Sequence, residues 1–124
     1  MRNFLNNMYK YNEQVNIRAL EEYVLSTYTQ HYSQGNFQAT EFIIDGGHGM
    51  GFCIGNIMKY AQRYGKKNGY NRADLMKVLH YGLIALYVHD IENANRVYNL
   101  EHPEEKPNDP PIEVNYNLQL LNEG

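Results

Sequence analysis

The segment that begins near Arg72 carries the longest helical pattern of the chain and constrains the fold most. Leu75, Val78, Leu79, Leu83 and Leu86 form one helical stripe, which further apolar side chains widen: Met76, Ile84, Ala85 and Val88. A helix that is apolar over most of its circumference is buried on several sides. In so small a chain it predicts either the core helix or a subunit interface. Gly82 lies in the middle and would let another helix pack closely.

A glycine-rich stretch followed by a second amphipathic pattern precedes this helix. Four glycines fall within six residues: Gly46, Gly47, Gly49 and Gly51. They predict a loop that bends sharply and lets a ligand approach its backbone. Beyond them, one helical stripe is apolar and predicted to be buried: Ile54, Ile57, Met58 and Ala61. A second stripe on the same helix is polar: Asn56, Lys59, Tyr60 and Arg63. Gly65 stands where a helix C-cap glycine belongs.

The remaining segments predict an all-α chain. A helix is expected from about Asn16, as N-cap, to residue 32 or 33, and a short one over 38–44, where the sequence alone does not settle helix against strand. Asn71 followed by Asp74 marks the start of the long helix. Residues 1–15 are interpreted as an N-terminal arm, 16–100 as a small helical domain with a long core helix, and 101–124 as a proline-rich linker and an extended C-terminal tail.

Composition narrows the possible functions. A chain of 124 residues predicts one domain, and its net charge of −3 argues against a general nucleic-acid coat. Any positive surface must be local, and positions 59–77 hold six of the eleven Lys and Arg residues. Cys53 is the only cysteine, which excludes an intramolecular disulfide and fits a reducing compartment. With neither a signal peptide nor a long apolar run, we expect a soluble, cytoplasmic protein.

The polar stripe of the central helix suggests phosphate binding. Free amide N–H groups at a helix start and cations along its length are what a phosphate requires. Two ordinary alternatives remain open: the stripe only faces water, or the basic residues offset the helix dipole. The candidate phosphate- or ligand-binding residues are His48, Gly49, Gly51, Asn56, Lys59, Tyr60, Arg63, Lys66 and Lys67. A secondary set comprises His31, Tyr32, Tyr64, Asp74, Lys77 and Tyr81.

The central segment resembles the SaV-like family of small phage proteins. The resemblance rests on Cys53, Gly55-Asn56-Ile57, Lys59-Tyr60, Arg63, Gly65-Lys66-Lys67, Asp74-Leu75, Lys77 and Tyr81, with His31-Tyr32 and residues 41–45 upstream. It covers about residues 31–87. One member of that family is a phage nucleotide kinase that lacks a P-loop. The resemblance implies a helical phage protein with a role related to nucleotides.

The chemistry-bearing residues favour holding a nucleotide over transforming it. The chain has no Gly-x-x-x-x-Gly-Lys-Ser/Thr loop, and its histidines show no zinc-ligand spacing with Cys53. Asp45 and Asp74 could hold a metal ion, although Asp74 is also a favourable first-turn residue. Cys53 could be an activated thiol at a helix start or a core residue. No catalytic residue is assigned.

Three hypotheses follow for the function. The first is a phage nucleotide-binding protein, a sponge that sequesters a cyclic nucleotide immune signal in the infected host cell. The second is a nucleoside monophosphate kinase, which would need Mg²⁺; no cofactor is expected otherwise. The third is an inhibitor that docks on an acidic protein. We expect a homo-oligomer that binds a small nucleotide, with no membrane or extended nucleic acid as partner.

Overall fold

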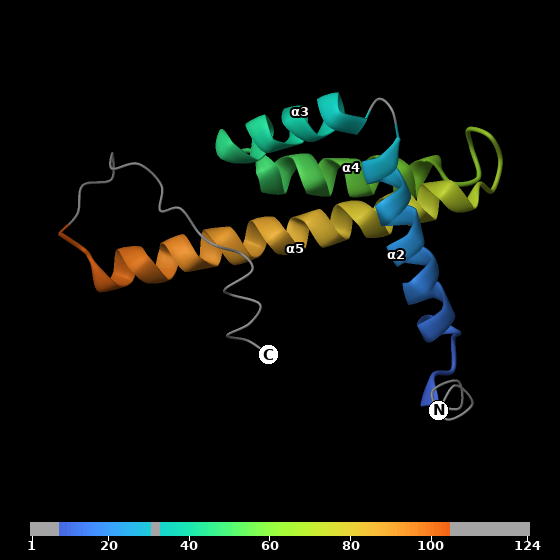
Figure 1. Ribbon diagram of the computed structural model, residues 1–124, viewed down its shortest axis with the longest axis horizontal. Coiled ribbons are helices and arrows are strands. Elements are labelled where there is room, and N and C mark those ends of the chain that lie inside the picture. The colour runs from blue at the N-terminus through green and yellow to red at the C-terminus, as the bar shows by residue number, and fades with distance from the viewer. Residues whose placement is uncertain (1–7, 31–32, 105–124) are drawn as a thin grey trace.

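The computed structural model describes residues 8–30 and 33–104, and the described residues contain helices and no strand. The helices are α2 (Glu13–Thr29), α3 (Ser33–Asp45), α4 (Gly49–Arg63) and α5 (Arg72–Glu101) (Figure 1). The all-α prediction with one long helix is therefore confirmed. No helix in the described ranges combines the length and the apolar character that crossing a membrane requires.

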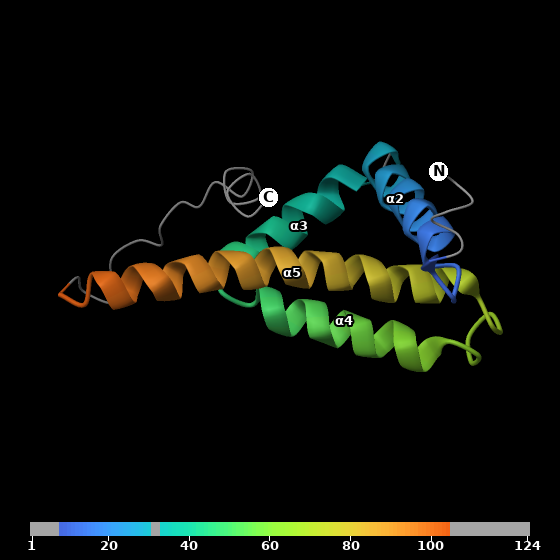
Figure 2. The same ribbon diagram turned by 90° about the horizontal axis from the view of Figure 1, so that it is seen from below.

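The helices α4 and α5 run antiparallel side by side and form the centre of the molecule. Figures 1 and 2 show α3 folding back along this pair and α2 crossing α5 near the start of α5. The C-terminal part of α5 projects beyond the end of α4. The long helix α5 continues to Glu101.

The connection between α4 and α5 is set by residues that the sequence identified. Gly65 has φ +86°, and its backbone N–H donates to the carbonyl of Gly69 at 3.0 Å. Gly65 directly follows Tyr64, the C-cap residue of α4, and its positive φ, together with a Cβ position 2.7 Å from Cε1 of Tyr70, favours glycine there. At the start of α5 the side chain of Asn71 accepts a hydrogen bond from the backbone N–H of Ala73 at 2.9 Å. Both predicted caps are confirmed.

Other predicted boundaries shift. Helix α2 begins at Glu13 after an N-cap Asn12 with φ 62°, so the predicted N-cap Asn16 lies inside the helix. The short helix predicted over 38–44 is confirmed as helical and is longer, as α3. The proposed glycine loop is shorter than predicted, because Gly49 and Gly51 belong to the first turn of α4. Residues 105–124, which contain the predicted tail, lie outside the described residues.

The buried core of the described chain is small. Its buried hydrophobic residues are Cys53, Met76 and Val88. Gly49 is buried beside them, and a Cβ there would lie 3.0 Å from Val88 and 3.1 Å from Ile44. Gly49 therefore serves close packing of α4 on its neighbours, not ligand approach. Burial also raises the pKa of the Cys53 thiol above its ordinary value, which supports the core interpretation and not that of an activated thiol.

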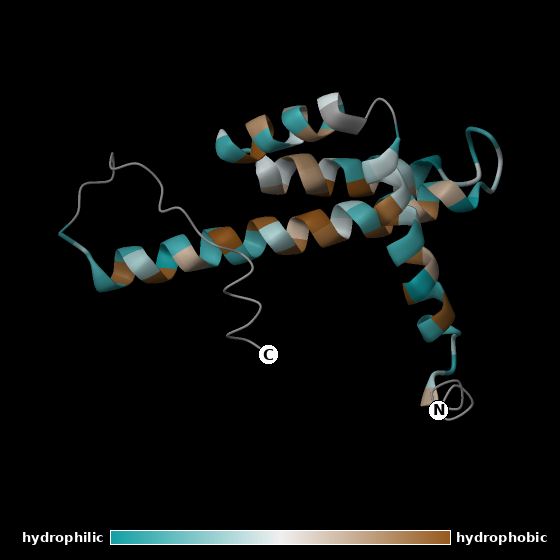
Figure 3. Ribbon diagram, viewed as in Figure 1, coloured by the Kyte–Doolittle hydropathy of each residue, from teal (hydrophilic) through white to brown (hydrophobic). Residues whose placement is uncertain are grey.

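The face of α4 that meets α5 differs from the predicted one. Of the stripe predicted to be buried, Ile54 and Met58 are 44% and 65% exposed, Ala61 is exposed and Ile57 is half-buried. The buried or half-buried residues of α4 are Gly49, Met50, Phe52, Cys53, Asn56, Ile57, Tyr60 and Arg63. The prediction of a buried apolar stripe on α4 is thus wrong for three of its four residues in the single chain. Figure 3 shows hydrophobic residues along much of α5, and several large hydrophobic residues of this helix are exposed.

His80 joins α2 to α5 and makes the fold sensitive to pH. Its ring meets the ring of Tyr23 edge-on, with centroids 5.9 Å apart. Burial lowers the pKa of His80 below its ordinary value of 6.5, because desolvation disfavours the imidazolium. At pH values between the lowered pKa of His80 in the folded chain and its ordinary pKa in the unfolded chain, the imidazole binds more protons when the chain is unfolded. Stability should therefore fall as the pH falls below about 6.5, and stop changing once the folded-state pKa is passed.

Chemical denaturation of the wild type and of His80→Leu between pH 7.5 and 5.5 checks this expectation. The variant should lose the part of the pH dependence that His80 contributes. His48→Gln is a matched control, because His48 is an exposed histidine. If His80→Leu retains the full pH dependence of the wild type, the assignment to His80 is wrong.

Candidate anion-binding site

An aromatic cluster (Phe52, Tyr60 and Tyr81) joins the middle of α4 to α5. The rings of Tyr60 and Tyr81 are nearly parallel, with centroids 6.0 Å apart and an interplanar angle of 10°. Phe52 meets Tyr81 edge-on at 5.7 Å. Because Phe52, Asn56 and Tyr60 are spaced by four residues, they share one face of α4. Phe52 was not among the residues predicted from the sequence, although its spacing from Asn56 and Tyr60 was a signal that could have identified it.

A cation cluster (Lys59, Arg63 and Lys77) surrounds the ring of Tyr60. The Nζ atoms of Lys59 and Lys77 lie 5.0 and 4.9 Å from the ring centroid, and Cζ of Arg63 lies at 5.9 Å. Two of these cations come from α4 and one from α5. Cation–π contacts at exposed sites contribute only about 0.5–1 kcal/mol each. They therefore do not by themselves account for placing three cations together.

One of the three cations is balanced by the protein itself. The Nε atom of Arg63 lies 3.5 Å from Oδ1 of Asp74, whose side chain is 4% exposed. Asp74 thus links the end of α4 to the start of α5. Its Oδ2 atom and Nε of Arg63 are buried without a hydrogen-bond partner. The charge of Arg63 is therefore held for structure, and Asp74 is a member of that ion pair as well as a first-turn acid.

The two lysines of the cluster have no such partner. Within the ranges that the structure describes, neither ammonium lies within 4.0 Å of a carboxylate. Since both lie about 5 Å from the same ring centroid, they are at most about 10 Å apart. That upper limit exceeds the Debye length of about 8 Å at physiological salt, so repulsion between the two charges would be largely screened at the full separation. An anion placed between the two lysines could contact both ammonium groups.

Tyr81 adds a hydrogen-bonding group to the same region. Burial raises the pKa of Tyr81 above its ordinary 10.0, and the nearby Tyr60, Tyr23 and Cys53 raise it further. The phenol therefore keeps its proton at neutral pH. It can donate a hydrogen bond, while its ring offers a flat apolar surface to a stacking group.

The glycine end of α4 is separate from the cation cluster. His48, the N-cap of α4, is exposed, and its side chain makes no capping hydrogen bond. From Gly49 to Lys59 the helix rises by about 15 Å, at 1.5 Å per residue. One phosphate group therefore cannot touch both ends. The candidates His48, Gly49 and Gly51 do not join the lysines in a single phosphate site.

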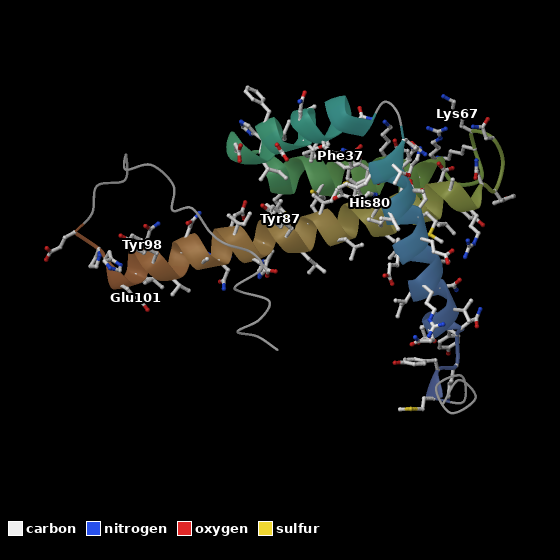
Figure 4. The ribbon with its side chains drawn as sticks, viewed as in Figure 1. Phe37, Lys67, His80, Tyr87, Tyr98 and Glu101 are labelled. Atoms are coloured by element: carbon white, nitrogen blue, oxygen red, sulfur yellow. The ribbon has the colours of Figure 1, made fainter. Side chains whose placement is uncertain are left out.

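Other candidates have local partners or lie at the rim. The side-chain amide of Asn56 donates to the carbonyl of Phe52 at 2.9 Å, and Nζ of Lys66 donates to Oε1 of Gln62 at 3.3 Å. Lys67 is exposed in the loop after α4, at the opposite end of the molecule from Tyr98 and Glu101 (Figure 4). The ring of Tyr64 meets that of Tyr70 edge-on. His31 and Tyr32 lie outside the described residues.

The described part of the chain contains no group of three His, Cys, Asp or Glu side chains that could hold a metal ion. A pocket of about 180 Å³ is lined by residues around the start of α2, none of them a candidate: Tyr9, Lys10, Asn12 and Gln14. The cation cluster lies between α4 and α5, where Lys59 is exposed and Lys77 is half-buried.

Comparison with known proteins gives a family without an assigned activity. Residues 26–82, somewhat under half of the chain, match the model of a family described as a protein of unknown function (DUF3310). No curated protein and no solved structure matches the chain. The matched segment includes α3, α4 and the first part of α5, so it contains the cation cluster and the aromatic cluster.

Proposed function

We propose that this chain binds a nucleotide through its phosphate groups at the cation cluster, and that it acts as a phage sponge for a cyclic nucleotide immune signal. The observation that carries the proposal is the pair of lysines. Lys59 and Lys77 come from different helices, both point at Tyr60, and neither ammonium has a carboxylate partner among the described residues. Two unbalanced ammonium groups held close together favour an anion between them.

The surroundings of the two lysines suit a nucleotide better than a simple anion. Lys59 and Lys77 can neutralise phosphate oxygens. The rings of Tyr60 and Tyr81 offer flat surfaces, and stacking of a base on an aromatic side chain contributes about 1–3 kcal/mol. With a net charge of −3, the rest of the chain would not attract anions by itself. We therefore assign phosphate binding to the cation cluster and base stacking to the two tyrosines.

The family match supports the same region without naming a ligand. It spans residues 26–82, nearly the segment that resembles the SaV-like phage proteins. The phage origin and the link to nucleotides rest on that resemblance. Binding is favoured over phosphoryl transfer because Asp74, the acid beside the cluster, is already paired with Arg63.

Calorimetry with a panel of phosphorylated ligands tests the proposal. The panel contains cyclic dinucleotides, cyclic ADP-ribose isomers, nucleoside monophosphates and inorganic phosphate. We expect one nucleotide to bind more tightly than inorganic phosphate, with an affinity that falls as salt rises, and to be recovered unchanged after denaturation. Binding of nothing in the panel would contradict the proposal and favour an acidic protein partner.

Incubation with ATP, Mg²⁺ and each nucleoside monophosphate separates a sponge from a kinase. A sponge leaves every ligand unchanged. Formation of a nucleoside diphosphate would refute the sponge and establish the kinase hypothesis instead. A reaction without added protein, and one with the heat-denatured chain, control for contaminating activity in the reagents.

A further inference from the structure

Four leucines on α5 form a stripe that the described part of the chain leaves about half exposed. This leucine stripe (Leu75, Leu79, Leu83 and Leu86) is spaced by four, four and three residues, so its side chains share one helical face. Each of them is 42–59% exposed. The buried residues Asp74 and Val88, which face α4, lie on the other side of the helix. The stripe therefore points away from the site proposed above, to which Lys77 contributes.

The chain needs more apolar burial than it achieves alone. Only three hydrophobic residues are buried in the described ranges. Ordering each residue costs about 1–2 kcal/mol of backbone entropy, whereas fully burying a leucine side chain contributes about 1.5–3 kcal/mol. Covering the leucine stripe would add to a small core. A second copy of the chain offers a stripe of identical length and shape.

The charges of α5 indicate how a second copy would lie. On the side of the leucine stripe, the first half of α5 carries Arg72, whereas the second half carries Asp90. Antiparallel helices would place the basic half of each copy on the acidic half of the other and oppose their dipoles. Parallel helices would instead place Asp90 opposite Asp90, which is repulsive.

We propose that the leucine stripe is a self-association surface on which a second copy of α5 packs antiparallel, with the two-fold axis at Gly82 and Leu83. Leu79 then lies opposite Leu86 of the second copy, and Asp90 lies within about one helical turn of its Arg72. The side chain of Arg72 donates to the neutral amide oxygen of Asn16, and among the described residues it forms no ion pair, so its charge is available. A Cβ at Gly82 would meet nothing within 4 Å, which leaves room for close approach.

The same register covers other exposed apolar side chains. Val97 and Leu100, which are 45% and 80% exposed, would lie beside the loop at 65–71 of the second copy. That loop contains Tyr70, which is 80% exposed. Because Lys59 and Lys77 are outside this contact, self-association goes beyond the proposed nucleotide binding. Either one can fail while the other holds.

Sedimentation velocity of the full chain over a concentration series tests the surface. We expect the wild type to associate and Leu83→Glu to sediment at a lower mass, because a carboxylate at the two-fold axis meets its own copy. Phe42→Glu is the matched control, since Phe42 is an 80% exposed apolar residue on α3. Its mass should equal that of the wild type. A monomeric wild type, or an unchanged mass for Leu83→Glu, would overturn the proposal.

Disulfide trapping tests the orientation with substitutions that keep the stripe apolar. In the proposed dimer, residue 83 lies beside residue 83 of the second copy, whereas the two residues 75 are about 22 Å apart along the axis. A disulfide needs Cα atoms about 4.4–6.8 Å apart. Leu83→Cys should therefore cross-link with itself under oxidation and Leu75→Cys should not; Cys53 is fully buried and should not interfere. If both variants cross-link, the two helices lie parallel. If neither variant cross-links, the two helices do not meet at this surface. Either result overturns the proposal.

Discussion

Asp74→Ala is expected to lower the free energy of unfolding by about 2–3 kcal/mol. The substitution leaves Nε of Arg63 buried without its carboxylate, and truncating one member of a buried ion pair costs about 3–5 kcal/mol. The lower figure applies because the side chain of Arg63 is 23% exposed, so water screens part of the charge. Asp74 also contributes a negative charge to the first turn of α5. Urea denaturation followed by circular dichroism measures the difference.

A matched control for this prediction lies on the same helix. Glu92 and Arg96 form an exposed pair four residues apart, at 4.0 Å. Glu92→Ala should change stability by less than about 0.5 kcal/mol. A double-mutant cycle with Arg63→Ala isolates the pair itself, since Asp74→Ala should then cost little more than its helix-dipole contribution. If Asp74→Ala and Glu92→Ala lower the free energy of unfolding equally, the buried pair of Arg63 and Asp74 does not stabilise the contact between α4 and α5.

Replacing Lys59 and Lys77 together by alanine is expected to weaken nucleotide binding about a hundredfold, or about 3 kcal/mol. Each lysine contributes one charged hydrogen bond to phosphate, worth about 1.5–3 kcal/mol, and partial exposure places the pair at the low end. Each single variant should bind the nucleotide about tenfold more weakly than the wild type. Calorimetry with the ligand found in the panel measures the affinity, and thermal unfolding shows that the double variant remains folded.

A variant with the same change in net charge controls for long-range attraction. Lys10 and Arg18 are exposed and belong to neither the cation cluster nor its rim. Lys10→Ala combined with Arg18→Ala should change the affinity less than twofold, because their charges are screened at physiological salt. If both double variants lose affinity equally, the attraction is diffuse and the site at Tyr60 is not the one used.

The ion pair between Arg63 and Asp74 changes which residues are assigned to phosphate binding. The sequence placed Arg63 among the phosphate ligands because a guanidinium binds oxyanions in a bidentate manner. In the structure Asp74 already holds its Nε atom, so Arg63 positions α4 against α5 and thereby sets the distance between Lys59 and Lys77. The proposed phosphate contacts therefore pass to the two lysines.

Local features were readable from the sequence because they depend on neighbouring residues. Helix periods, the C-cap at Gly65 and the N-cap at Asn71 follow from dihedral preferences and from hydrogen bonds within a few residues. The grouping of Lys59, Tyr60 and Arg63 on one helical face follows from the same periodicity. Lys77 and Tyr81 were added by resemblance, and the structure brings both to Tyr60.

Tertiary packing decided what periodicity cannot express. A helical period shows which residues share a face but not which face meets another helix, so the stripe with Asn56, Tyr60 and Arg63 turned toward α5 while Ile54 and Met58 stayed exposed. The pairing of Arg63 with Asp74 likewise depends on where whole helices lie in space. The sequence by itself indicated the helices, the ends marked by Gly65 and Asn71, and which residues share a helical face. Only the packing of α4 on α5 decided which charges are neutralised and which remain available for a ligand.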